Sequence, residues 1–251
     1  MTSLRAAIFF LTRIPIGLGR QSPSLSQRAV SWFPTVGALI GSVIGLIYVG
    51  LFQFLPSAVA AALAVGFGVG LTGTFHLDGH ADSDGAIGDR ATIERGLEKP
   101  GNSRLRTYGT STFVLVLLIE MAALATLGPW VGFTSLVAAH SAGRSATVCV
   151  MTLTRKAARE SLGIDGVSEL KRLQSFVGIC AGSTIVIWVT GPIGFLLLVL
   201  AIPATALTWA WSHRVLGRTA AGSLGAIAQL SQTSVLVGAV VLNDGACACS
   251  W

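Results

Sequence analysis

Hydrophobic residues in this chain stand in long runs that short polar segments separate. A helix needs about 20 apolar residues to cross the hydrocarbon layer of a membrane. About seven runs approach that length, and they lie at residues 31–54, 57–75, 110–127, 130–151, 176–190, 193–211 and 220–242. Small residues are frequent within several of them, which lets helix backbones approach closely. The pattern predicts an all-α, polytopic membrane bundle of about seven transmembrane helices, forming one domain over residues 1–251.

The N-terminal stretch, "MTSLRAAIFFLTRIPIGLGR", has a different pattern. Its apolar core is short and Arg13 interrupts it, so it does not fit a secretory signal peptide. We expect an amphipathic, interfacial helix that lies on the inner surface of the membrane.

Charge is scarce and unevenly placed. Charged residues make up 11% of the chain and hydrophobic ones 52%, whereas soluble domains are about a quarter charged. The 17 lysines and arginines fall into groups at residues 5–28, 90–106, 144–159, 171–172 and 214–218. With seven spans, all these groups lie on one side of the membrane. The rule that basic residues stay inside then places these segments in the cytoplasm and the C-terminus outside.

The same charge pattern limits the partners that we expect. The net charge of +6 is explained by topology and by contact with anionic lipid of the plasma (inner) membrane. A lipid bilayer is therefore an expected partner and nucleic acid is not. The sequence leaves open whether the chain forms a homo-oligomer.

Acidic residues gather in the segment "TFHLDGHADSDGAIGDR" and just beyond it. Six of the eleven lie between positions 78 and 98. If a helix continues here, Asp78 and Asp82 stand one turn apart on the same face and repel each other. A divalent cation between them removes that repulsion, and carboxylate oxygens suit Mg²⁺. The alternative interpretation is a solvated loop without a ligand.

Basic residues follow the acidic ones within "EKPGNSRLRTYGT". By themselves, Lys99, Arg104 and Arg106 fit a purely topological role. Next to a carboxylate cluster, they are suited to hold phosphate oxygens, because phosphoryl transfer depends on positioning and charge neutralisation. The residues thus predict a Mg²⁺-dependent enzyme that acts on a phosphoanhydride, with a cytoplasmic catalytic loop at about residues 77–109.

Five stretches together resemble one known family. "FHLDGHADSDG" is similar to the acidic signature of cobalamin synthase, the adenosylcobinamide-GDP ribazoletransferase family. In the order of the chain, "FFLTRIPIG", "WFPTVGALIGSVIGLIY", "SRLRTYGT" and "LGAIAQLSQ" resemble further segments of that family. The resemblance covers nearly the whole chain.

The resemblance implies one of the last steps of vitamin B12 biosynthesis. Adenosylcobinamide phosphate passes from adenosylcobinamide-GDP to α-ribazole or α-ribazole 5′-phosphate with Mg²⁺, and GMP is released. By matching positions, Asp78, Asp82 and Asp84 are the implied catalytic and metal-binding residues, and one of them is a candidate base. The candidate substrate-binding residues are His76, Lys99, Arg104 and Tyr108.

The chain departs from the family pattern at several positions. Only Ser83 separates the second and third aspartates, Arg106 replaces a glycine, and Gly222 and Gln229 stand where acidic residues are expected. A catalytically impaired homologue is therefore one alternative. A CDP-alcohol-type membrane phosphotransferase is another, although its D-G-x-x-A-R stretch is absent. A transporter fits less well, because the polar residues gather in a loop and not at the bilayer midplane.

Glu120 is a separate candidate, inside the predicted third span. Ionisable residues there are costly and are functional candidates by default. We expect Glu120 to form a structural pair with His140 or Arg144 of the fourth span.

Overall fold

The computed structural model describes residues 2–14, 28–73, 103–154, 172–216 and 221–248. In these ranges the helices are α1 (Thr2–Leu11), α3 (Phe33–Phe52), α4 (Ser57–Thr72), α7 (Ser103–Thr126), α8 (Pro129–Leu153), α10 (Arg172–Thr190), α11 (Ile193–Leu216) and α12 (Ala221–Ala248). The prediction of an all-α bundle is confirmed for the described part of the chain.

Each predicted apolar run corresponds to a helix of the bundle. Four stretches are long and apolar enough to cross a membrane: Phe33–Phe52, Arg172–Thr190, Ile193–Arg214 and Ser223–Asn243. The chain is therefore a multi-pass membrane protein. The apolar helices Ser57–Thr72 and Thr110–Thr126 are shorter, so the count of seven spans stays a prediction, as does the interfacial position of α1.

Proline and glycine set the ends of the helices. Pro56 precedes α4 and Pro129 begins α8, which fits a residue that has a fixed φ and no backbone donor. Gly191 lies between α10 and α11 with a φ of 67°, a left-handed conformation that glycine adopts without steric cost. The breaks between these predicted apolar runs thus coincide with helix ends in the structure.

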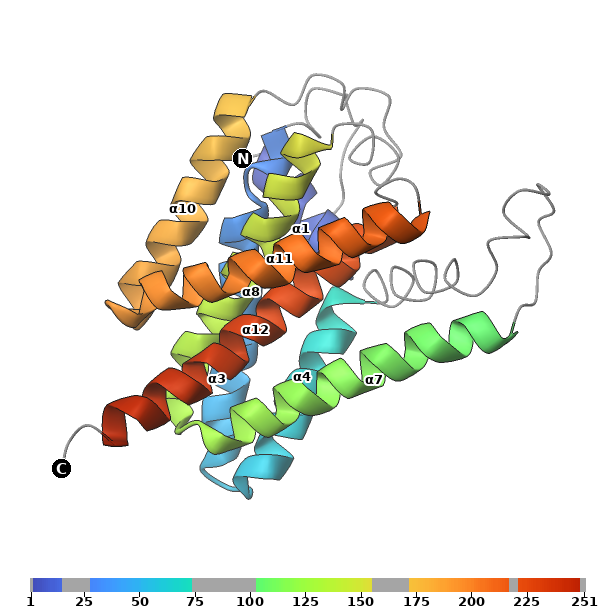
Figure 1. Cartoon of the computed structure of the whole chain (residues 1–251). Helices are drawn as coiled ribbons and strands as arrows, with labels where there is room; N and C mark the ends of the chain where they lie inside the picture. The colour runs from blue at the N-terminus through green and yellow to red at the C-terminus, as the bar shows by residue number, and fades with distance from the viewer. Residues whose placement is uncertain (1, 15–27, 74–102, 155–171, 217–220, 249–251) are drawn as a thin grey trace.

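Helix α8 is central to the bundle (Figure 1). It packs against α3, α10, α11 and α12. Most of its side chains are buried, among them the polar His140 and Arg144. Helices α4 and α7 lie side by side, and α7 also contacts α12.

Glycines bring the helices next to α8 into backbone contact with it. A Cβ atom at Gly37 of α3 would lie 2.5 Å from the carbonyl oxygen of His140. On α8 itself, a Cβ atom at Gly143 would lie 2.6 Å from the carbonyl oxygen of Ala228 in α12. Small residues at such crossings permit close packing in membrane bundles. These contacts hold α8, which carries His140, close to both α3 and α12.

A buried tyrosine connects α3 with the end of α7. The hydroxyl oxygen of Tyr48 lies 2.8 Å from the carbonyl oxygens of both Leu124 and Leu127, and its single O–H is shared between these two acceptors. Tyr48 has no exposed surface. Its hydroxyl group supplies a donor at a helix end that otherwise leaves carbonyl groups unpaired, and the carbonyl oxygen of Leu124 also accepts the backbone N–H of Leu127 at 3.1 Å.

The outer faces of α10 and α11 are apolar. Trp188 is 84% exposed, and Phe195 and Ile202 are exposed by more than half. Large contiguous apolar patches are unusual on soluble proteins, so these faces fit a protein that resides in a bilayer.

Candidate functional site

Most of the residues predicted to carry the chemistry belong to the segment between α4 and α7. Five of them lie outside the described residues: His76, Asp78, Asp82, Asp84 and Lys99. Arg104 and Tyr108 belong to the first turns of α7. Within the described ranges, no group of three or more histidine, cysteine, aspartate or glutamate side chains could hold a metal ion. The predicted Mg²⁺ ligands therefore stay a prediction.

The point where the chain leaves α4 toward this segment is well defined. Gly73 ends the helix with a φ of 73°, and the side chain of Arg13 packs over it, since a Cβ atom there would lie 2.5 Å from Nε of Arg13. The backbone N–H of Arg13 donates to the carbonyl oxygen of Leu71 at 2.9 Å. Phe10 of α1 stacks on Phe33 with ring centroids 5.4 Å apart. The end of the N-terminal helix is thus anchored where the acidic segment begins.

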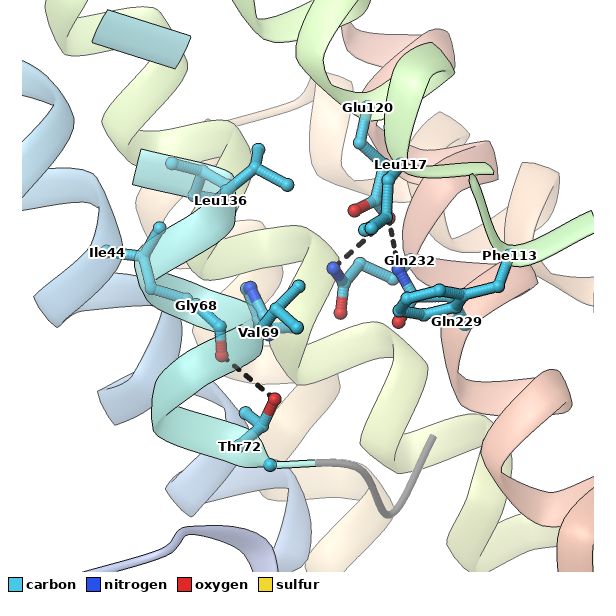
Figure 2. A pocket seen from close by; sticks show the side chains of 13 residues that line it. Ile44, Gly68, Val69, Thr72, Phe113, Leu117, Glu120, Leu136, Gln229 and Gln232 are labelled. Carbon is cyan, nitrogen blue, oxygen red and sulfur yellow. Dashed lines mark hydrogen bonds between the residues drawn. The ribbon is translucent and has the colours of Figure 1, made fainter. Parts of the chain in front are cut away.

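Glu120 forms a polar cluster inside the bundle with three side chains of α12. Its Oε1 atom accepts hydrogen bonds from Nε2 of Gln229 at 2.9 Å, Nε2 of Gln232 at 3.2 Å and Oγ1 of Thr233 at 2.8 Å. Glu120 is 2% exposed, and its three partners are also buried. Figure 2 shows both glutamine side chains directed at the carboxyl group. We call these four residues the Glu120 cluster.

The partners of Glu120 differ from those expected from the sequence. We expected His140 or Arg144 of α8, but the three hydrogen bonds come from α12, because α7 packs against α12. A buried carboxyl group needs hydrogen-bond partners, and amide and hydroxyl donors fill that need here.

A sequence signal for these partners exists. Gln229, Gln232 and Thr233 stand at i, i+3 and i+4 of the mostly apolar helix α12, which places them on one face. Such a polar stripe indicates a buried partner on a neighbouring helix. It does not tell which helix supplies that partner.

A small cavity adjoins the Glu120 cluster. It measures about 30 Å³ and is lined by residues of α3, α4, α7, α8 and α12. Phe113 is among its apolar lining, and its polar lining comes from Thr72, Glu120, His140, Gln229 and Gln232. Gly73, where α4 gives way to the acidic segment, also lines it. The volume suffices for roughly two water-sized groups.

His140 is the one cavity-lining histidine in the described residues. It is 6% exposed, and its Nδ1 atom is buried without a hydrogen-bond partner within the ranges that the structure describes. Buried polar atoms are almost always satisfied in folded proteins. Since His140 also lines the cavity, its imidazole ring is a candidate contact for a small polar group there.

Comparisons with known proteins agree with the resemblance. A family model for cobalamin-5-phosphate synthase matches residues 3–240. An adenosylcobinamide-GDP ribazoletransferase of Halorubrum lacusprofundi is 32% identical, over 96% of this chain and 97% of the relative. Similar proteins of that name come from Citrobacter koseri, 30% identical over 92% of this chain and 96% of the relative, and Bradyrhizobium diazoefficiens, 29% identical over 98% and 95%. No solved structure matches the chain.

These matches extend over both the described helices and the acidic segment. They set aside the alternative of a CDP-alcohol-type phosphotransferase. The chain belongs to the cobalamin-5-phosphate synthase family.

Proposed function

We propose that this membrane protein is an adenosylcobinamide-GDP ribazoletransferase that acts in cobalamin biosynthesis. The observation that carries this conclusion is the family match over residues 3–240, together with relatives of that name that align over nearly their full length. The substrates are adenosylcobinamide-GDP and α-ribazole or its 5′-phosphate.

The reaction is a phosphoryl transfer. A ribose hydroxyl oxygen of the acceptor attacks the phosphorus atom that is linked to cobinamide, and a new oxygen–phosphorus bond forms. The bond between that phosphorus atom and the bridging oxygen breaks, and GMP leaves with the electron pair. The hydroxyl proton passes to a carboxylate of the acidic segment.

We assign the catalytic chemistry to the segment between α4 and α7. Asp78, Asp82 and Asp84 offer the hard carboxylate oxygens that Mg²⁺ prefers. The ion, when bound, neutralises charge on the diphosphate. The basic and polar residues that hold phosphate oxygens are His76, Lys99, Arg104 and Tyr108. Helices α4 and α7, which precede and follow this segment in the chain, pack against each other.

We also propose an orientation for the single domain of residues 1–251. The basic groups place the acidic segment in the cytoplasm, α1 on the inner surface and the C-terminus outside, with seven spans between them. Labelling of single cysteines at residues 87 and 128 with a membrane-impermeant maleimide tests this proposal. Residue 128 should react in intact cells and residue 87 only after lysis, and the reverse pattern would refute the orientation.

The decisive experiment measures GMP release by the protein purified in detergent, with adenosylcobinamide-GDP, α-ribazole and Mg²⁺. Asp78→Asn and Asp82→Asn each remove one carboxylate and should lower the rate by at least about 100-fold, since ligand loss disrupts positioning and charge neutralisation together. Glu94→Gln is the matched control, because it removes an acidic charge from the same segment outside the proposed ligand set. If all three variants lose activity equally, the assignment of the ligands is wrong.

A catalytically impaired homologue is the second candidate. The absence of acidic residues at Gly222 and Gln229 favours it. Gln229 nevertheless donates a hydrogen bond to Glu120 of α7. A carboxyl group is therefore present beside this position of α12, which argues against an impaired homologue. Wild-type protein that releases no GMP above background would favour the impaired homologue.

A further inference from the structure

We propose that the cavity beside the Glu120 cluster receives a ribose hydroxyl group of the acceptor nucleoside, and that His140 and the Glu120 cluster contact it. The inference rests on the proposed function. It adds a binding site for the acceptor that is formed by the membrane helices, apart from the acidic segment.

The first argument is the position of the cavity. Its lining includes both Glu120 of α7 and Gly73 at the end of α4. Gly73 immediately precedes the segment to which we assign phosphoryl transfer. A group held in this cavity therefore lies between the interior of the bundle and the start of that segment.

The second argument is the orientation of the polar groups. Gln229 and Gln232 both donate through Nε2 to Glu120, and each carboxamide then presents its carbonyl oxygen away from the carboxyl group. Because both glutamines line the cavity, these oxygens are acceptors for a bound donor. The buried Nδ1 atom of His140 has no partner in the described part of the chain. A hydroxyl group, which donates one hydrogen bond and accepts others, matches this set.

The third argument is size and charge. A cavity of about 30 Å³ admits a hydroxyl or hydroxymethyl group but neither a nucleotide nor a corrinoid. Among the described residues that line it there is no lysine or arginine that could pair with an anion. Apart from Thr72, whose hydroxyl group donates to the carbonyl oxygen of Gly68, the remaining side chains of the lining are apolar, as are Phe113 and Val69. The diphosphate of adenosylcobinamide-GDP is therefore excluded, and a neutral hydroxyl group of the acceptor fits.

The test varies both substrates and measures their KM values separately. His140→Leu removes the hydrogen-bonding nitrogen and should raise KM for α-ribazole about tenfold, as expected for the loss of one buried hydrogen bond. KM for adenosylcobinamide-GDP should stay unchanged. His140→Asn places a polar atom where Nδ1 lies and should recover most of the affinity, whereas His140→Gln, whose polar atom is further out, should not.

A second pair of variants does not depend on His140. Val69→Leu adds a methylene group at the cavity and should also raise KM for α-ribazole. Val59→Leu makes the same change on the exposed face of the same helix and should leave both KM values unchanged. Circular dichroism of each variant confirms that the protein is folded.

Equilibrium dialysis with α-ribazole alone separates this inference from the proposed function. Wild-type protein that binds α-ribazole more tightly than Val69→Leu, yet releases no GMP, would support the site and refute the activity. Normal GMP release with an unchanged KM for α-ribazole in His140→Leu and Val69→Leu would overturn the site and leave the activity standing. Equal increases in both KM values would also overturn it, because a purely structural role predicts that result. Wild-type protein that neither binds α-ribazole nor releases GMP would overturn both.

Discussion

The three hydrogen bonds to Glu120 allow a quantitative prediction of stability. Glu120→Leu removes the acceptor that Gln229, Gln232 and Thr233 share. Hydrogen bonds between membrane helices contribute about 0.6 kcal/mol each on average, so their joint loss should cost roughly 2 kcal/mol. Thr233 keeps a second acceptor, the carbonyl oxygen of Gln229 at 2.9 Å, whereas the two carboxamides are left with unpaired donors.

Glu120→Gln is the matched control for this prediction. Its carboxamide oxygen can still accept hydrogen bonds at nearly the same position, so the free energy of unfolding should fall by less than about 1 kcal/mol. Unfolding is followed by far-ultraviolet circular dichroism while sodium dodecyl sulfate is added to the protein in mild detergent. The midpoint should fall clearly for the leucine variant and only slightly for the glutamine variant.

A double-mutant cycle then tests whether the two helices are coupled through this cluster. Gln229→Leu in the background of Glu120→Leu should cost less than Gln229→Leu alone, by at least about 0.5 kcal/mol, as for other residues in direct contact. Equal stability of Glu120→Leu and Glu120→Gln, together with strict additivity in the cycle, would refute the reasoning.

Three other predictions concern packing and the metal. Tyr48→Phe should lower the free energy of unfolding by about 1 kcal/mol, because the carbonyl oxygens of Leu124 and Leu127 lose the buried hydroxyl donor that they share. The same detergent titration measures this, and an unchanged midpoint would contradict it. Gly41→Ala should destabilise the protein by about 1–3 kcal/mol, since a Cβ atom there would lie 2.5 Å from the carbonyl oxygen of Leu136. Gly50→Ala, on the same helix with open space around it, should be neutral. Removal of divalent cations with EDTA should abolish GMP release without loss of helix, and Mg²⁺ should restore the release better than Ca²⁺; activity that persists in EDTA would count against a metal site.

Hydropathy alone predicted the helices well, because each one must bury or shield its backbone in an apolar medium. The predicted and observed bounds differ where a helix extends beyond its apolar run. Helix α7 begins at Ser103, well before the apolar run predicted from residue 110. Its first turns contain polar residues that are compatible with a helix but not with lipid, and a search for apolar runs does not detect them.

The candidate site was harder to predict from the sequence than the helices were. The concentration of carboxylates in one segment is visible in the composition, because charge is otherwise rare in the chain. The partners of Glu120 were not predicted, since they depend on which helices pack together. Gln229 illustrates this limit: by its residue type it suggests a lost acid, whereas in the bundle it is a donor to the buried carboxyl group of another helix.

The burial of His140 and Arg144 in α8 has a consequence for membrane insertion. When α8 leaves the ribosome, α3 has already been synthesised, but α10, α11 and α12 have not. An isolated helix with these two side chains would expose them to lipid, at a cost of several kcal/mol. We therefore expect α8 to remain beside the translocon until α10, α11 and α12 have been synthesised. Stable insertion of a helix from the first half of the chain then depends on helices from the second half.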